Sequence, residues 1–518
     1  MSIKNAYCEF NTSSLPINPI GTDDENFGLL VLELNKVDIT GRPIFILFTV
    51  DATGSMSENV TGYTTKIQYA IQTLKSIVKY LSTQEIEVYV QINTFNDTVH
   101  TLIPPTKVSV QSLEQILSLL ESIDAYRSTN IEVALNAATS SIAKYSSANP
   151  NHSCVHIFMT DGEPTLGADT PDELIKCVSN EYLSINIGFG CDHNAKLLYE
   201  LSKGSNSEYH FIDKVEDASV VYGESLHKVM YPSLHNVCIS VNNGVIYDWI
   251  NNKWSNSIYE RTLISEVKKY YHIKSSTPDI VDIVINAHSE SIAENNEIYM
   301  TPVEEHVDML PDKINSSTGN ILHDTNIIIF SFRHCVLELL YEAIHTKSGM
   351  CISPDLLPLK RRIHDLFDKL HTYAENNQLV SNGFIKQLMN DMYIIYWNID
   401  DRNGKIYIYG RYSAQGNQYA HTPGNNRIHN LIVDEGFDTP MRPNLRRNSN
   451  TRIQHNSLNI FNTNYLTDMN TDSIDINDDD DDSSNGQTDT EYSSYSTPGI
   501  RSTASTIQSL DYSHTSQI

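Results

Sequence analysis

The sequence is poor in the features that mark secreted and membrane-spanning proteins. Its 518 residues include only 7 cysteines, an odd number, and no Cys-x-x-Cys pair. Sparse, unpaired cysteines favour reduced thiols in a cytosolic setting over a disulfide framework. No apolar run reaches the roughly 18–20 residues that cross a bilayer, and the first residues contain no apolar signal-peptide core. We therefore expect a cytoplasmic protein without a membrane span.

Basic residues are also scarce, since 36 Lys and Arg are outnumbered by 64 Asp and Glu and the formal net charge is -28. A protein that binds a phosphate backbone needs a basic surface, so nucleic acid is not an expected partner. The sequence has no Gly-x-x-x-x-Gly-Lys-Ser/Thr phosphate loop, no Gly-x-Ser-x-Gly elbow and no His-Glu-x-x-His motif. These absences exclude several large enzyme classes, and nothing positive in the sequence points to another, so we expect a protein that is not an enzyme.

The most informative segment is an apolar run, residues 44–50, that ends on the carboxylate of Asp51. Two hydroxyl residues follow, Thr53 and Ser55, with Gly54 between them. A hard divalent cation prefers oxygen ligands, and glycine lets the backbone fold back so that such ligands converge. The segment predicts a cation site at the end of a buried strand, although these residues alone would also suit a turn with a helix cap.

Two further segments supply polar residues at comparable positions. Apolar residues recur at helical spacing over 131–142, which places Thr129 at a helix start, where a hydroxyl can cap the helix or bind a metal. Residues 155–160 form a second apolar strand, followed by Asp161 and Gly162. The carboxyl ends of parallel strands lie at one edge of a sheet. We therefore expect all three segments to meet there.

In this order and approximate spacing, the three segments resemble the von Willebrand factor A (VWA) domain with its metal-ion-dependent adhesion site. The family pattern is Asp-x-Ser-x-Ser, then a Thr, then Asp-Gly. The matching residues are Asp51, Thr53, Ser55, Thr129 and Asp161. Thr53 replaces the first Ser of the pattern and keeps its hydroxyl, and the Thr-Gly-Ser-Met sequence at 53–56 resembles a variant found in intracellular VWA proteins. The resemblance covers residues 41–220, and it leaves open a VWA fold that has lost its metal.

The resemblance implies a mechanism for the site. Thr53, Ser55 and Thr129 would bind Mg²⁺ or Mn²⁺ directly, while Asp51 and Asp161 would act mainly through water. An Asp or Glu carboxylate of a partner protein would then complete the octahedron that Mg²⁺ demands. The expected function is a non-enzymatic, Mg²⁺-dependent module for adhesion or scaffolding.

The order of patterns along the chain predicts its organisation. In 41–220, alternating strands and helices favour a doubly wound, mostly parallel sheet of the VWA or Rossmann-like class. Closely spaced strand patterns after it favour a small antiparallel β-domain, with a strong signal for a hairpin turn at Asn243-Gly244. The remaining predicted parts are an N-terminal segment, 1–40, whose residues 23–40 can add a strand to the β-domain; the β-rich domain, 221–325; a three-helix unit, 326–402; an irregular segment, 403–440; and a disordered acidic tail rich in Asn, Ser and Thr, 441–518.

Two alternatives remain at this point. The chain is rich in Asn and Ile, as AT-rich genomes favour, and has a long polar tail. These features suit a structural scaffold of a large DNA virus, located in the virion or host cytoplasm, in which the metal site has minor importance. Cys191-Asp192-His193 could contribute to a zinc site, but no second ligand pair stands at a known spacing, and a strand-end loop explains it better.

We predict that residues 441–518 are dispensable for folding, because low hydrophobicity and a run of five aspartates at 478–482 disfavour a packed core. Limited proteolysis should remove this tail first and leave a stable body. A tail that resists the protease as long as the body does would contradict the prediction.

Overall fold

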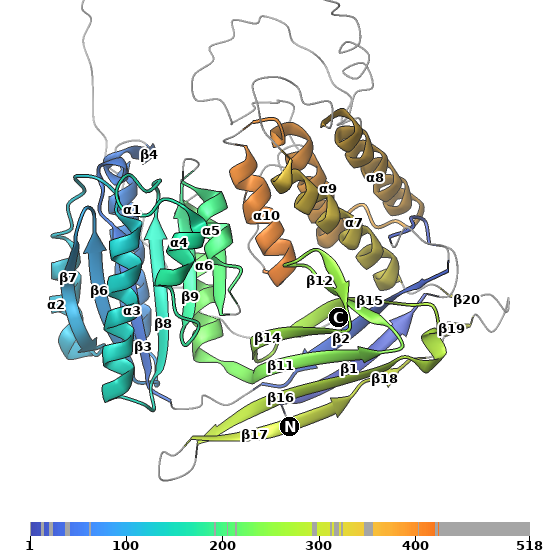
Figure 1. The fold of residues 1–518 in the computed structure, drawn as a ribbon, viewed down its shortest axis with the longest axis horizontal. Helices are drawn as coiled ribbons and strands as arrows, with labels where there is room; N and C mark the ends of the chain where they lie inside the picture. The colour runs from blue at the N-terminus through green and yellow to red at the C-terminus, as the bar shows by residue number, and fades with distance from the viewer. Residues whose placement is uncertain are drawn as a thin grey trace, which may run out of the picture. The chain divides into compact units, whose positions relative to one another are not determined.

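A computed structural model describes most of the chain up to residue 423 (Figure 1). The described residues are 2–11, 15–19, 24–36, 42–61, 64–190, 193–204, 206–212, 215–292, 298–310, 313–314, 321–322, 325–346, 356–401, 404–419 and 423. All of them belong to one contact unit, Met1–Ser457. The predicted tail, 441–518, lies outside the described residues, as do Cys191 and Asp192 and the part of the predicted irregular segment beyond Pro423.

A six-stranded sheet occupies the region that resembles a VWA domain, with the strand order β10-β9-β8-β3-β6-β7. Its strands are β3 (Ile44–Asp51), β6 (Val88–Phe95), β7 (Val99–Lys107), β8 (Ser153–Thr160), β9 (Leu183–Phe189) and β10 (Ser207–Ile212). All neighbours are parallel except β6 and β7. All 8 residues of β3 are buried, which is why this strand is a continuous apolar run in the sequence. The predicted doubly wound, mostly parallel sheet is confirmed.

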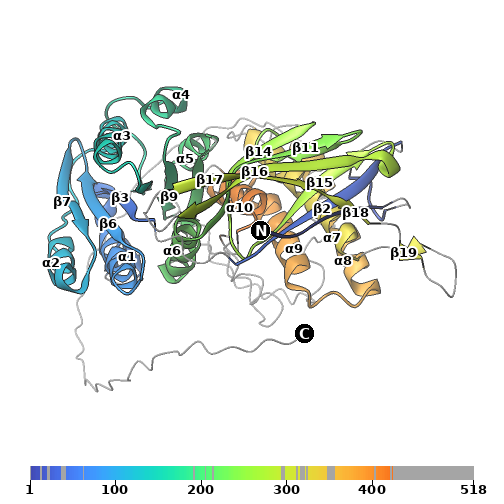
Figure 2. The same cartoon turned by 90° about the horizontal axis from the view of Figure 1, so that it is seen from below.

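Helices cover both faces of this sheet, with α1, α2 and α6 on one face and α3, α4 and α5 on the other (Figure 2). Their bounds are α1 (Lys66–Leu81), α2 (Val110–Leu120), α3 (Ile131–Ala148), α4 (Pro171–Leu174), α5 (Ala195–Leu201) and α6 (Val215–Met230). Short elements between them are η1 (Gly54–Ser57), β4 (Asn59–Thr61), β5 (Thr64–Thr65) and η2 (Ile175–Cys177). Alternate residues of β3 face opposite sides, so Ile46 and Phe48 pack with α1 and Phe45 and Leu47 with α3.

Two further sheets have the strand orders β13-β12-β15-β2-β1-β18 and β14-β11-β16-β17. All neighbouring strands in them are antiparallel except β1 and β18, which are parallel. Their strands are β1 (Ile3–Phe10), β2 (Asn26–Leu34), β11 (Pro232–Asn242), β12 (Val245–Asp248), β13 (Lys253–Ser255), β14 (Ser257–Ile264), β15 (Lys268–Ser275), β16 (Asp282–Ile292), β17 (Ile298–His306) and β18 (Asp308–Met309). The remaining short elements are η3 (Pro278–Ile280), β19 (Lys313–Ile314) and β20 (Ile321–Leu322). One apolar core contains side chains from both sheets, among them Leu32 of β2 and Ile239 of β11, so the two sheets form a sandwich.

The N-terminal segment contributes more to this sandwich than the sequence suggested. The predicted strand in 23–40 is β2, which pairs with β15, but β1 also joins the sheet beside β2. The predicted hairpin at Asn243-Gly244 is wrong. Asn243 has the left-handed φ of 57° that such a turn requires, yet β11 and β12 lie in different sheets. The turn therefore passes the chain from one sheet of the sandwich to the other.

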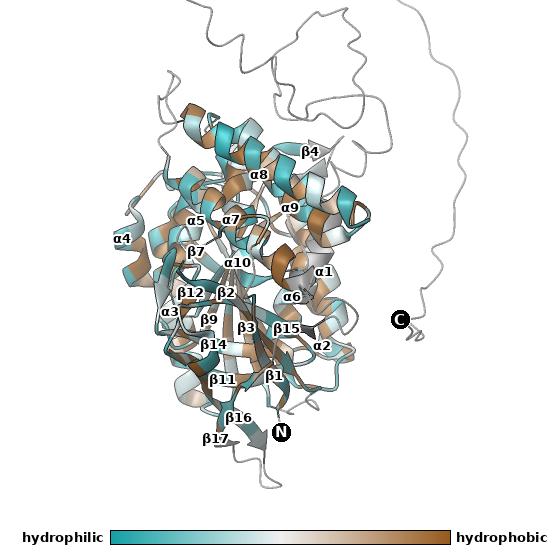
Figure 3. Cartoon of the chain, turned by 90° about the vertical axis from the view of Figure 1, so that its right-hand side faces the viewer, coloured by the Kyte–Doolittle hydropathy of each residue, from teal (hydrophilic) through white to brown (hydrophobic). Residues whose placement is uncertain are grey.

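Within the described residues, four helices follow the sandwich: α7 (Thr325–His345), α8 (Leu356–Asn376), α9 (Gly383–Asn398) and α10 (Lys405–Asn417). The apolar face predicted for α8 is buried, and hydrophobic and hydrophilic residues alternate along the helix (Figure 3). No helix in the described ranges is both long and apolar enough to span a membrane. Where one domain ends and the next begins remains a prediction.

Helix α10 corrects the prediction of an irregular segment from residue 403. Nearly all of its residues are buried, on every side, so the sequence has no amphipathic period to detect. Its two glycines suggest a loop, but both serve close packing. A Cβ at Gly416 would lie 2.1 Å from the ring of Trp249, and one at Gly410 would lie 3.1 Å from Phe211.

A buried polar network joins α7, α9 and α10 to β15. Arg411 forms an ion pair with Asp391, and both side chains are 0% exposed. Gln415 donates to Asp391 at 2.6 Å and accepts a hydrogen bond from Arg333 at 3.3 Å. The Arg333 guanidinium also contacts Nε2 of His272 at 3.1 Å. Because a guanidinium only donates, His272 must accept there, and burial accordingly lowers the pKa of this imidazole well below its usual value.

Asp391→Ala should strongly destabilise the protein, because it leaves the Arg411 guanidinium buried without its counter-ion. Breaking a buried pair in this way costs about 3–5 kcal/mol, which urea titration of the unfolding free energy would measure. Asp400→Ala is the matched control, since it breaks a 3.1 Å pair with Lys360 in which the Asp400 side chain is 47% exposed, at a cost below about 1 kcal/mol. Similar losses in the two variants would contradict the prediction.

Candidate metal centre

Strand β3 brings Asp51 to the carboxyl edge of the sheet. The side chain is 0% exposed, and two groups hold its oxygens in place. The backbone N–H of Thr53 donates to Oδ1 at 2.9 Å, and the hydroxyl of Thr160, the last residue of β8, donates to Oδ2 at 2.6 Å. Burial, followed by the nearby Asp161 carboxylate, raises the pKa of Asp51 to about 6. A cation at this edge would relieve the electrostatic strain between the two acidic groups.

The loop after Asp51 folds back, as the sequence predicts for Gly54. The backbone N–H of Gly54 donates to the carbonyl of Arg127 at 3.1 Å, and this hydrogen bond connects the loop to the segment that carries Thr129. The hydroxyl oxygens of Thr53 and Ser55 are 3.1 Å apart. Two of the three predicted direct ligands therefore already lie side by side.

Asp161 approaches the same point from the end of β8. Its Oδ1 accepts a hydrogen bond from the Ser55 hydroxyl at 2.8 Å, and the residue is 1% exposed. A serine that donates its proton to a carboxylate keeps its oxygen lone pairs for another partner. The contact therefore leaves the lone pairs of the Ser55 oxygen available to bind a metal ion.

Thr129 lies next to these groups but does not cap the helix. The cap of α3 is Asn130, whose side chain accepts from the N–H of Val133 at 3.1 Å, so the capping role considered for Thr129 is wrong. A Cβ built on Gly162 would lie 3.4 Å from Oγ1 of Thr129 and 3.6 Å from Oγ of Ser55. The two hydroxyls thus border one small space, which the missing side chain at Gly162 leaves open.

The structure adds one residue that the sequence analysis missed. Lys66 is the first residue of α1, and its ammonium is 2.8 Å from Oδ2 of Asp161 and 3.0 Å from Oε2 of Glu58. Only 6% of its side chain is exposed. A lysine at a helix N-terminus opposes the helix dipole. This unfavourable placement could have drawn attention to Lys66, but it does not identify Asp161 as the partner.

Of the other metal candidate in the sequence, Cys191-Asp192-His193, only His193 is among the described residues. Both ring nitrogens of His193 are engaged, with the Gly190 carbonyl and the Tyr209 hydroxyl, each at 2.7 Å. Burial lowers the pKa of His193 to about 4. Among the described residues, no group of three or more His, Cys, Asp or Glu side chains is placed to hold a metal. The site at Asp51 differs from such groups because three of its five residues are Ser or Thr, which offer hydroxyl oxygens.

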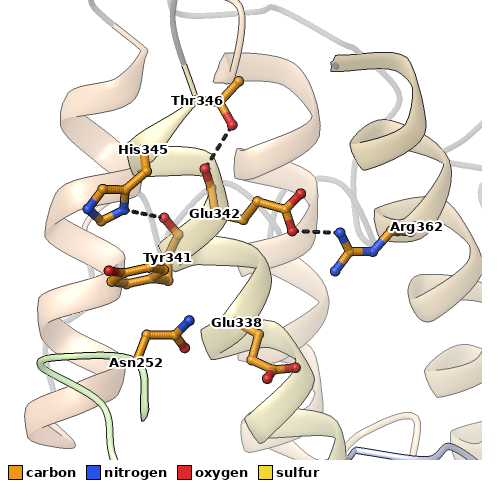
Figure 4. A pocket seen from close by; sticks show the side chains of 7 residues that line it. All are labelled: Asn252, Glu338, Tyr341, Glu342, His345, Thr346 and Arg362. Carbon is orange, nitrogen blue, oxygen red and sulfur yellow. Dashed lines mark hydrogen bonds and ion pairs between the residues drawn. The ribbon is translucent and has the colours of Figure 1, made fainter. Parts of the chain in front are cut away.

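A cavity of about 460 Å³ lies in the helical part of the chain, beside α7 and α8 (Figure 4). Its polar groups largely satisfy one another. Arg362 pairs with Glu342 at 2.6 Å, His345 donates through Nδ1 to the Tyr341 carbonyl at 2.8 Å, and the Thr346 hydroxyl donates to the Glu342 carbonyl at 2.8 Å. None of the predicted site residues lines it.

Comparison with known proteins supports the identification of the sheet region. The model of the von Willebrand factor type A domain matches residues 46–223. Human inter-alpha-trypsin inhibitor heavy chain H6 is 24% identical over 213 residues, which are 39% of this chain and 16% of that protein. The chain thus matches only about a sixth of the length of this curated relative.

Two solved structures resemble a larger part of the chain at low identity. A von Willebrand factor type A protein from Catenulispora acidiphila is 11% identical, with a TM-score of 0.48, over 75% of this chain and 89% of that one. The ArnB paralog VWA2 from Sulfolobus acidocaldarius is 14% identical, with a TM-score of 0.47, over 80% of this chain and 98% of that one. The match of the family model to residues 46–223, together with the curated relative, shows that this chain contains a von Willebrand factor type A domain.

Proposed function

We propose that this chain is a non-enzymatic protein-binding module of the cytoplasm that captures a partner's Asp or Glu carboxylate through a bound Mg²⁺ or Mn²⁺ ion. The observation that carries the proposal is the convergence of hydroxyls and carboxylates from three separate segments at one edge of the sheet. The proposed metal residues are Asp51, Thr53, Ser55, Thr129 and Asp161.

The chemistry of these groups suits a hard cation, because every donor is oxygen. The hydroxyls of Thr53, Ser55 and Thr129 are neutral, so they would leave the ion strongly electrophilic. Asp51 and Asp161 already accept hydrogen bonds from neighbouring donors, which fits a role in orienting those donors and bound water. An ion held in this way would favour an anionic ligand from outside the protein.

The surroundings of the site suit a protein partner. Ser55 and Gly162 are only partly buried, so the open space between them faces solvent. Two large apolar side chains stand on adjoining segments, Tyr126 at 50% and Leu166 at 45% exposed. The Tyr126 backbone N–H bonds to the Ala52 carbonyl, and that of Leu166 bonds to the Thr129 carbonyl. A partner could therefore combine a carboxylate on the ion with apolar contacts around it.

The first test is metal binding by the purified chain. Mn²⁺ should bind at one site, and Asp51→Asn should weaken binding by at least about tenfold, because it removes a charge close to the ion. Calorimetric titration measures both. Asp97→Asn is the control, since the Asp97 side chain is 36% exposed and pairs with Arg127. Unchanged Mn²⁺ affinity in Asp51→Asn would refute the proposed site.

The second test concerns the carboxylate. Acetate should bind to the Mn²⁺-loaded chain, and neutral acetamide should not, because only the anion satisfies the open coordination position. Paramagnetic broadening of the acetate carboxyl ¹³C signal reports contact with the ion. Thr129→Ala should lose most of this broadening, whereas Thr129→Ser, which keeps the hydroxyl, should retain it. Equal broadening by acetate and acetamide, or broadening that survives a chelator, would contradict direct capture.

A further inference from the structure

Lys66 occupies a position that helix formation does not explain. The cap of α1 is Thr65, whose hydroxyl accepts from the Gln68 N–H while the Gln68 side chain accepts from the Thr65 N–H. This capping box starts the helix without any contribution from the lysine side chain. A cation at this end also opposes the helix dipole, and its burial is costly unless it is paired. The reason for Lys66 must therefore lie in its partners.

The partner that matters is Asp161, because Glu58 has a side chain that is 61% exposed and hence largely screened by water. The Asp161 side chain is 0% exposed, and its two oxygens face different groups. Oδ1 accepts from the Ser55 hydroxyl, and Oδ2 contacts the Lys66 ammonium. A single carboxylate therefore links a proposed metal ligand to a fixed positive charge.

The charges of the buried groups around the proposed ion determine whether it favours an anionic or a neutral ligand from outside. Asp51 and Asp161 contribute two negative charges, which a divalent cation alone would cancel. The Lys66 ammonium lies 2.8 Å from one of them, so an ion at the site meets less net negative charge than the two carboxylates alone would provide. A carboxylate from outside supplies the negative charge that Lys66 offsets, and a neutral ligand does not.

From this geometry, and resting on the function proposed above, we propose that Lys66 makes the metal centre depend on an external carboxylate. Its ammonium weakens metal binding by the free chain and strengthens capture of an anion by the loaded chain. The two effects have opposite signs. A lysine that only stabilised the fold around the site would, when removed, weaken both kinds of binding.

The experiment compares wild type with Lys66→Met, which keeps the length of the side chain and removes its charge. Mn²⁺ affinity is measured by the electron paramagnetic resonance signal of the free ion, and acetate affinity by the ¹³C broadening of the loaded chain. We expect Lys66→Met to bind Mn²⁺ about tenfold more tightly and acetate about tenfold more weakly, as loss of one nearby buried charge implies. Lys75→Met is the matched control, because Lys75 lies on the same helix and pairs with exposed Glu121; both affinities should stay within about twofold of wild type.

A second measurement uses wild type alone and does not depend on the variant folding. Acetate, compared with chloride at equal ionic strength, should increase the Mn²⁺ affinity of wild type, because the two ligands must strengthen each other reciprocally. The same comparison in Lys66→Met should show a smaller increase. No acetate effect in wild type would overturn the inference even if the variant does not fold, and it would also refute the carboxylate capture in the proposed function, because the two ligands must act on each other equally.

The outcomes separate this inference from the function on which it rests. Weaker binding of both Mn²⁺ and acetate by folded Lys66→Met would make Lys66 a structural residue and overturn the inference, as would unchanged affinities. In either case, Mn²⁺ and acetate binding by wild type would still support the proposed function. Absence of Mn²⁺ binding in wild type would instead refute the proposed function and the inference together.

Discussion

The pairing of β3 with β6 on one side and β8 on the other is the constraint on which the site depends. Asp51 lies opposite Phe95, and Val50 lies opposite Met159, so Thr160 and Asp161 reach the edge just beside Asp51. Backbone hydrogen bonds hold the loops at this edge together. One of them runs from the N–H of Asn130 to the carbonyl of Asn96 at 2.9 Å. A slip of one residue in either pairing would separate the two carboxylates and point alternate side chains into the wrong layer.

The same pairing also creates an electrostatic problem. Two carboxylates become buried at one edge, and burial raises the pKa of Asp51 to about 6. Hydrogen-bond donors offset the cost of burying these carboxylates. The Thr160 hydroxyl and the Thr53 N–H donate to Asp51. The Ser55 hydroxyl and the Lys66 ammonium donate to Asp161. Only Lys66 among these donors carries a full charge. It follows that the hydroxyls set the geometry of the site, whereas Lys66 sets its charge.

The parts predicted correctly from the sequence are those in which burial leaves a simple pattern. β3 and β8 are apolar runs that end on Asp51 and just before Asp161, and α8 has one apolar face, so periodicity suffices for each. Burial on all sides removes the period from α10, and its glycines fit Trp249 and Phe211, which are distant in the sequence. Lys66 was missed for a related reason. Its importance comes from Asp161, 95 residues away, and no local pattern records that contact.

Helix α10 joins the VWA sheet away from the loops that carry Ser55 and Gly162. Helix α10 packs against α5 and β10, and the Ser413 hydroxyl donates to the Tyr209 carbonyl of β10 at 2.8 Å. Strand β10 ends the sheet, with β9 and β8 between it and β3. An open sheet edge tends to recruit other strands, and packing against α10 protects this one. The partly exposed Ser55 and Gly162 lie on the loops that follow β3 and β8, so a carboxylate can approach them without displacing α10.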